Sequence, residues 1–152
     1  MSILNKLNKS STSSTVADQL IELFCKNSGI QNCSISNGVF NIYGDDEWTH
    51  MYLATDDLGL IAGEDSNASK LLGIKEIQIY KHTSIVIKKA VKFDKNITLK
   101  SLSNIHLLRH NKSNESSIYG LNICCEKFIL DGDFYVRDSI INASSIHGFY
   151  KE

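Results

Sequence analysis

Residues 74–108 read IKEIQIYKHTSIVIKKAVKFDKNITLKSLSNIHLL, and apolar residues recur there in pairs, two positions apart. Each pair starts six or eight residues after the previous one, and the intervals between pairs are short and polar. Side chains two positions apart in a strand point to the same face, so each pair predicts a short strand with one buried face. The pairs are Ile77/Ile79, Ile85/Ile87, Val91/Phe93, Ile97/Leu99 and Ile105/Leu107.

The same spacing returns near the C-terminus, at Leu121/Ile123, Phe128/Leu130, Phe134/Val136, Ile140 and Ile146. Coils of a parallel β-solenoid turn every few residues and place Asn, Ser, Thr and Gly at their corners. Antiparallel sheets usually have strands of about five or six residues and turn signals about every 8 to 12 residues. We therefore expect a mainly β fold, a small parallel β-solenoid with an N-terminal helix. An antiparallel β-sandwich or barrel with one helix is the alternative.

The chain before residue 73 has a different pattern. We expect a flexible polar leader at 1–15 and a single domain at 16–152, which begins with a capping helix at 16–28. Apolar residues in that helix are three and four positions apart, and Thr15 is the expected N-cap. Asn37-Gly38 predicts a tight turn in a β-hairpin region at 33–63, whose later part we expect to form one or two strands. A polar connection at 64–72 then leads to a short-strand β region at 73–150.

Composition excludes several classes of protein. The 152 residues are 42% hydrophobic and 22% charged, with a formal net charge of -1 and no proline, which is unlike a disordered chain. No apolar run is long enough to span a membrane, and the polar N-terminus has no secretory core. We expect a protein that is cytoplasmic when made, and the sequence leaves open delivery by a leaderless secretion route.

No motif predicts catalysis, a cofactor or a metal. The four cysteines lack zinc-site spacing, because neighbouring Cys124 and Cys125 point to opposite faces of a strand. We expect reduced thiols, and whether Cys25 and Cys33 pair is open. The five histidines are scattered, and Asp131-Gly132-Asp133 predicts a tight corner rather than a calcium loop. The sequence therefore favours a protein that is not an enzyme.

Charge is separated by segment. Residues 45–69 carry seven carboxylates and no Lys or Arg, whereas residues 70–112 have a net charge of +8. The opposite charges of such segments can pair within one molecule or between two copies. Alternatively, one charged segment can bind a partner of the opposite charge. The candidate partner-binding residues are Asp45, Asp46, Glu47, Asp56, Asp57, Lys88, Lys89, Lys92, Lys95 and Lys100. The segment 70–112 is also a candidate site for a polyanion.

Three segments resemble known families. SIVIKKAVKFDKNITLKSLSNIHLL (84–108) resembles the repeated strands of bacterial β-solenoids, such as the tips of phage and type VI secretion spikes. FILDGDFYVRDSIINASSIHG (128–148) is similar to the coils of polymer-forming bactofilin-type proteins. VADQLIELFCKNSGIQNCSISNGVFNIYG (16–44) is similar to the opening of small type III secretion chaperones, although residues 73–150 lack the further helices of that family.

These patterns favour a non-enzymatic structural or interaction protein. We expect it to assemble with itself, as a homo-oligomer, or to bind a protein partner through exposed β surfaces and segregated charge. The alternative is an accessory partner-binding protein, such as a secretion chaperone or a toxin-immunity protein, that docks a basic client on its acidic segment.

Overall fold

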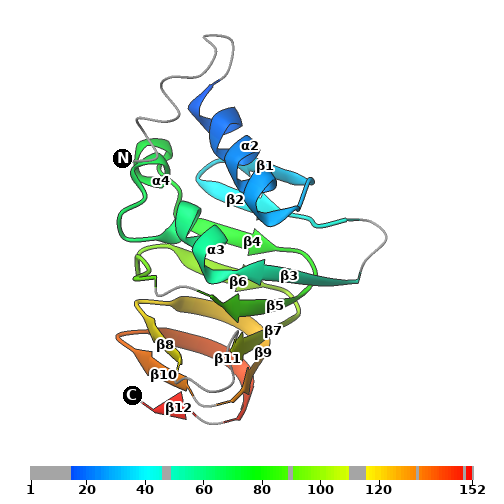
Figure 1. Ribbon diagram of the computed structural model, residues 1–152, viewed down its shortest axis with the longest axis vertical. Coiled ribbons are helices and arrows are strands. Elements are labelled where there is room, and N and C mark those ends of the chain that lie inside the picture. Colours follow the sequence, from blue (N-terminus) through cyan, green and yellow to red (C-terminus); the bar gives the residue numbers. More distant parts are fainter. Residues whose placement is uncertain are drawn as a thin grey trace.

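The computed structural model describes residues 15–45, 49–88, 91–109, 116–132, 134–148 and 150–151. Residues 1–14 of the leader predicted at 1–15 lie outside the described residues. The fold is mainly β, with a mixed nine-stranded sheet, a three-stranded sheet and an N-terminal helix (Figure 1). The elements are α2 (Val16–Ser28), β1 (Cys33–Ser36), β2 (Val39–Ile42), β3 (His50–Ala54), α3 (Thr55–Ala62), α4 (Asn67–Leu72), β4 (Glu76–Ile79), β5 (His82–Ile87), β6 (Thr98–Ser101), β7 (Asn104–Arg109), β8 (Ser116–Tyr119), β9 (Asn122–Asp131), β10 (Phe134–Arg137), β11 (Ile140–His147) and β12 (Tyr150–Lys151).

The predicted helix at 16–28 is confirmed as α2. Its N-cap is Thr15, whose hydroxyl accepts a hydrogen bond from the backbone N–H of Asp18 at 3.1 Å. Gly29 ends the helix with φ of 77°, a conformation that costs glycine little. Leu20 and Phe24 are fully buried, and the Phe24 ring meets Phe40 edge-on with centroids 5.2 Å apart. The helix therefore covers one end of the hydrophobic core.

The predicted hairpin is also confirmed. β1 and β2 are antiparallel, and the turn residues Asn37 and Gly38 both have positive φ, 52° and 76°. That pair of conformations defines the tight hairpin turn that an Asn-Gly dipeptide favours.

Residues 55–62 correct the sequence-based prediction, because they form helix α3 instead of a strand. Leu58, Ile61 and Ala62 are three and four positions apart, and all three are buried on one side of the helix. Asp56 and Asp57 lie in its first turn, where the helix dipole favours carboxylates, so they begin a helix rather than break a strand.

Parallel ladders join strands that are distant in the chain. β2, β4, β6 and the first half of β9 lie side by side, and so do β3, β5, β7 and the second half of β9. β11 pairs with both halves of β9, and β8, β10 and β12 form the three-stranded parallel sheet. Among the named strands of the described segments, only β1 and β2 pair antiparallel. The antiparallel alternative does not fit these ladders.

The ladders align apolar residues in rows that cross the sheet. Phe40, Ile77, Leu99, Ile123 and Ile141 form one row of directly paired neighbours. A second row of paired neighbours contains Met51, Thr83, Ile105, Phe128 and Ile146. The first four members of each row are buried, whereas Ile141 is partly buried and Ile146 is 42% exposed. The core is therefore a column whose β11 layer is incompletely covered.

Replacing a residue in the middle of this column should cost more than replacing one in its β11 layer. We expect Ile105→Ala to lower the free energy of unfolding by about 2–5 kcal/mol, because it removes buried contacts and leaves a cavity. Ile146→Ala should cost clearly less. Urea denaturation at low protein concentration measures both changes, and equal losses would contradict the incomplete cover of Ile146.

Candidate functional site

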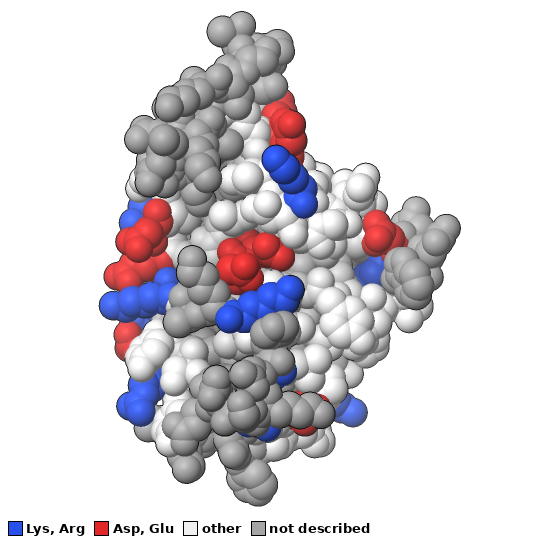
Figure 2. Space-filling view, in the orientation of Figure 1, with Lys and Arg blue, Asp and Glu red and all other residues white. Residues whose placement is uncertain are grey.

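Two lysines of the predicted basic segment form ion pairs within the chain. Lys92 Nζ lies 3.4 Å from a carboxylate oxygen of Glu64, which belongs to the predicted acidic segment, and Lys95 Nζ lies 2.7 Å from one of Asp138, which does not. On the face shown in Figure 2, basic side chains lie beside acidic ones instead of forming a separate patch. Exposed ion pairs contribute little to stability, but these pairs reduce the net charge that the basic segment offers to another molecule.

Of the acidic candidates, the structure describes Asp45, Asp56 and Asp57. Asp56 is exposed and Asp57 is partly buried. Burial and the neighbouring Asp56 raise the pKa of Asp57, and the ammonium group of Lys88 opposes this. The ammonium group of Lys81 donates a hydrogen bond to the backbone carbonyl of Asp45. Asp46, Glu47 and Lys89 lie outside the described residues.

The last basic candidate, Lys100, is partly buried on β6 and directly paired with Gln78 of β4 and Cys124 of β9. Lys88, Lys92 and Lys95 lie outside the named strands, and Lys92 pairs with Tyr119 in an isolated β-bridge. The described basic candidates therefore do not form one row of paired strand positions.

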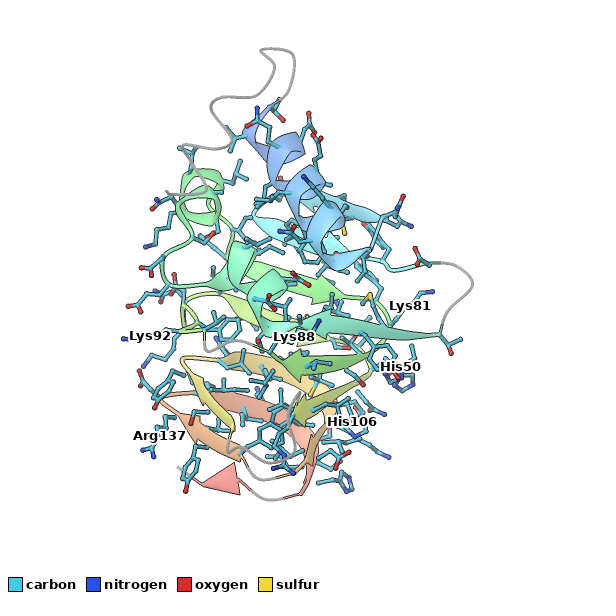
Figure 3. All side chains as sticks on the ribbon, in the orientation of Figure 1. His50, Lys81, Lys88, Lys92, His106 and Arg137 are labelled. Atoms are coloured by element: carbon cyan, nitrogen blue, oxygen red, sulfur yellow. The ribbon has the colours of Figure 1, made fainter. Side chains whose placement is uncertain are left out.

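Three histidines that the sequence scatters come together on β3, β5 and β7. His50 is directly paired with His82, and its Nε2 lies 2.7 Å from the hydroxyl of Ser84, which is itself paired with His106. Figure 3 shows His50 and His106 on the same side of the molecule, away from Lys92 and Arg137. Within the described segments, no three His, Cys, Asp or Glu side chains are arranged to hold a metal ion. His110 lies outside those segments.

The cysteines are free thiols. Cys25 and Cys33, whose pairing the sequence left open, contact each other through a hydrogen bond, and burial raises the pKa of Cys33 to about 12. Cys124 is partly buried and Cys125 buried, as expected for neighbours on opposite faces of a strand. A high pKa keeps a thiol protonated and unreactive, so Cys33 is unsuited to nucleophilic catalysis.

The most unusual surface is the free edge of β11. This strand has eight residues, IINASSIH, with no Asp, Glu, Lys or Arg, and within the described residues it pairs with β9 alone. The other edge strands of the large sheet, β1 and β3, have four and five residues. Natural proteins usually protect sheet edges with charge, proline or short strands, because the unpaired backbone groups attract another strand. β11 has none of these protections.

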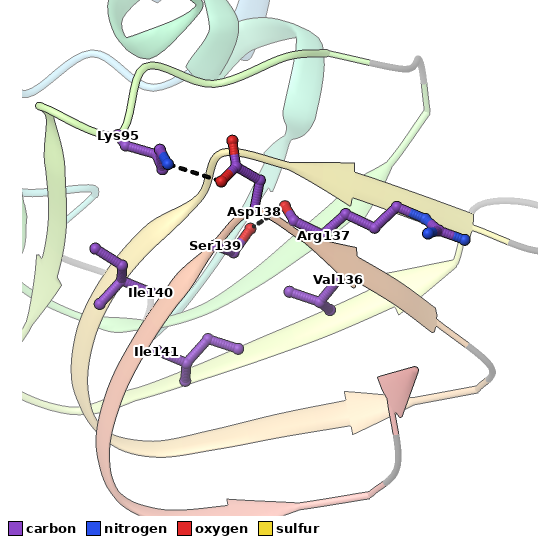
Figure 4. A pocket seen from close by; sticks show the side chains of 7 residues that line it. All are labelled: Lys95, Val136, Arg137, Asp138, Ser139, Ile140 and Ile141. Atoms are coloured by element: carbon purple, nitrogen blue, oxygen red, sulfur yellow. Dashed lines mark hydrogen bonds and ion pairs between the residues drawn. The ribbon is translucent and has the colours of Figure 1, made fainter. Parts of the chain in front are cut away.

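A cavity of about 500 Å³ lies where the chain enters β11 (Figure 4). The ion pair between Lys95 and Asp138 borders it, and Ser139 donates a hydrogen bond to the carbonyl oxygen of Arg137 at 2.9 Å. Its other lining residues are Val136, Ile140 and Ile141. Ile140 is 54% exposed, and because it both begins β11 and lines the cavity, the apolar surface of β11 extends to the cavity.

The sequence did not identify this edge. It indicated strand positions at Ile140 and Ile146 and included Lys95 among the basic candidates. The available signal was the run from Ile140 to His147, which combines strand spacing with a complete absence of charged residues. The separation of charge predicted binding sites within residues 45–112 instead.

The histidine cluster predicts how stability depends on pH. His50 is largely exposed, but the part of its side chain that neighbouring atoms shield from water lowers its pKa, and the nearby His82 and His106 lower it further. Below about pH 6.5 the unfolded chain therefore binds more protons at this site than the folded chain, so the free energy of unfolding falls as the pH drops. An NMR titration should give a lower pKa for His50 than for an unfolded histidine.

We expect His50→Gln to reduce this pH dependence, as measured by urea denaturation between about pH 7.5 and 5.5. Thr49→Gln, at the exposed residue before β3, is the control, because it introduces the same side chain and removes no imidazole. An unchanged pH profile for His50→Gln would contradict the prediction.

Two further findings bear on function. None of the helices in the described ranges is long and apolar enough to cross a membrane. Compared with known proteins, the chain matches no family model, no curated protein and no solved structure.

Proposed function

We propose that this chain is a small parallel β-solenoid and a non-enzymatic structural or interaction protein. It binds a protein partner or another copy of itself by adding a strand to the free edge of β11. The observation that carries the proposal is the combination found in β11, which is long, uncharged and paired on one side within the described residues.

The ladders support the solenoid. The order β2, β4, β6, β9 and the order β3, β5, β7, β9 each follow the chain, so every return of the chain adds a strand next to the one before. Their apolar residues are aligned in register, as in stacked coils. Stacked coils need a cap at each end, because an uncovered layer exposes apolar side chains and unpaired backbone groups. In Figure 1, α2 lies at the top, and β11 and β12 lie toward the bottom.

A strand added to β11 would pair the unpaired backbone groups of this last layer and cover its apolar side chains. Its backbone would supply hydrogen bonds along the edge, and its side chains would cover the β11 layer. Ile146 is 42% exposed although its paired neighbour, Phe128, is fully buried. Binding would therefore remove apolar surface from water, which favours association.

Docking of a basic client on the acidic segment has weaker support. The carboxylate of Asp57 lies near Lys88, and Glu64 is paired with Lys92. These neighbours reduce the negative charge available to a client. Pairing of Lys92 and Lys95 within the chain likewise weakens the case for a polyanion site.

The proposal is tested by affinity capture from the cells in which the protein occurs. Tagged wild type is compared with Ser144→Glu, which adds a carboxylate to the β11 edge beside Glu126, and with Ser117→Glu, the same change on β8. We expect material bound by wild type and by Ser117→Glu to be lost with Ser144→Glu, because a charge on the edge blocks strand addition. Identical captured material from all three proteins would contradict the proposal.

A further inference from the structure

We propose that the partner of β11 is the β11 strand of a second copy, paired antiparallel about a two-fold axis that passes between Ala143 and Ser144. This inference rests on the proposed function and specifies its partner. It follows from three features of the strand: its charge, its bend and the alternation of its side chains.

Charge allows the strand to pair with itself. Two identical edges bring like residues close together, and like charges directly opposite each other destabilise a pair of strands. β11 contains no Asp, Glu, Lys or Arg, so a second copy meets no repulsion from the strand itself. β9, which lies between other strands, carries Glu126, Lys127 and Asp131. The edge strands β1, β3 and β11 all lack Asp, Glu, Lys and Arg, and β11 is the longest of them.

The bend of β11 fits a two-fold axis. Residues 140–143 pair with 122–125, next to β6, whereas residues 145–147 pair with 127–129, next to β7. Ser144 lies between these two arms and has no partner in the ladder with β9. A two-fold axis through the bend, perpendicular to the direction in which the strands stack, exchanges the two arms and reverses the strand. It therefore places β11 antiparallel to its own copy along both arms.

Alternation of the side chains then selects the register. Ile141, Ala143 and Ile146 are paired with the buried residues Ile123, Cys125 and Phe128, so they face the core side of the layer. With Ile141 opposite Ile146 of the second copy, core-facing side chains meet core-facing side chains.

The same register also places outward-facing side chains opposite outward-facing side chains. Asn142 lies opposite Ser145 of the second copy, and Ile140 lies opposite His147. All four residues are paired with outward-facing neighbours in β9, at Asn122, Cys124, Lys127 and Ile129. A shift by one residue would place Ile141 opposite an outward-facing residue, which opposes the burial pattern.

Oligomeric state is the first test. Light scattering and sedimentation velocity on the purified full chain should show a dimer that dissociates on dilution. Ser144 donates a hydrogen bond to the carboxylate of Glu126 at 3.4 Å, so Ser144→Glu adds a second carboxylate beside Glu126 in each copy, next to the two-fold axis. This variant should raise the dimer dissociation constant roughly tenfold or more. Ser117→Glu should leave it unchanged. Circular dichroism checks that both variants fold.

The register has its own test, which does not depend on Ser144→Glu. Ile140→Cys and His147→Cys are made separately in a Cys124→Ser background and treated with a short thiol cross-linker. The mixture of the two variants should give a cross-linked dimer, because these positions lie opposite each other between copies. Each variant alone should give little, since its two cysteines lie at the far ends of the two arms, seven positions apart in the register.

The outcomes separate the two proposals. A protein that remains monomeric up to its solubility limit overturns the dimer. If capture from cells still depends on the β11 edge in that case, the partner is another protein and the proposed function stands. Cross-linking of each variant alone, at the level of the mixture, overturns the register.

Discussion

The whole molecule depends on the parallel pairing of strands in register. Each new strand must place an apolar residue beside the apolar residue of the strand before it, as in the row Phe40, Ile77, Leu99 and Ile123. Because the chain returns to the same edge each time, one layer supplies both the backbone partners and the buried surface for the next. The constraint explains why short strands of four residues are sufficient here. It also makes the last layer different from the others.

Polar residues within this column are tolerated only where they find local partners. Thr83 occupies a core-facing position between Met51 and Ile105, and its hydroxyl donates a hydrogen bond to the carbonyl oxygen of Lys81 at 2.8 Å. The outward positions of the same strands are less constrained, and they accept His50, His82 and His106. A chemically distinct cluster can therefore form on the outer face without disturbing the core.

Much of the fold could be predicted from spacing. The Ile77/Ile79 and Ile105/Leu107 pairs lie in β4 and β7, Leu99 lies in β6 with Ile97 just before it, and the helix at 16–28 has its predicted cap. Helix α3 was missed because Leu58, Leu60 and Ile61 contain both a two-residue and a three-residue spacing. The histidine cluster could not be predicted from the sequence. Because α3 and α4 lie between His50 and His82 in the chain, the spacing of these residues does not indicate that they are directly paired. The free edge of β11 became visible only when the strand order was known.

The proposed two-fold pairing of β11 would determine the size of the assembly. An isologous contact uses the same surface on both copies, so it closes on itself. A head-to-tail contact between opposite ends would instead repeat without limit and give a filament. Here α2 packs Leu20 and Phe24 onto the opposite end of the core, which leaves that end unsuited to stacking on β11. In the proposed assembly, α2 would therefore prevent further copies from adding, and the product would be a dimer and not a polymer.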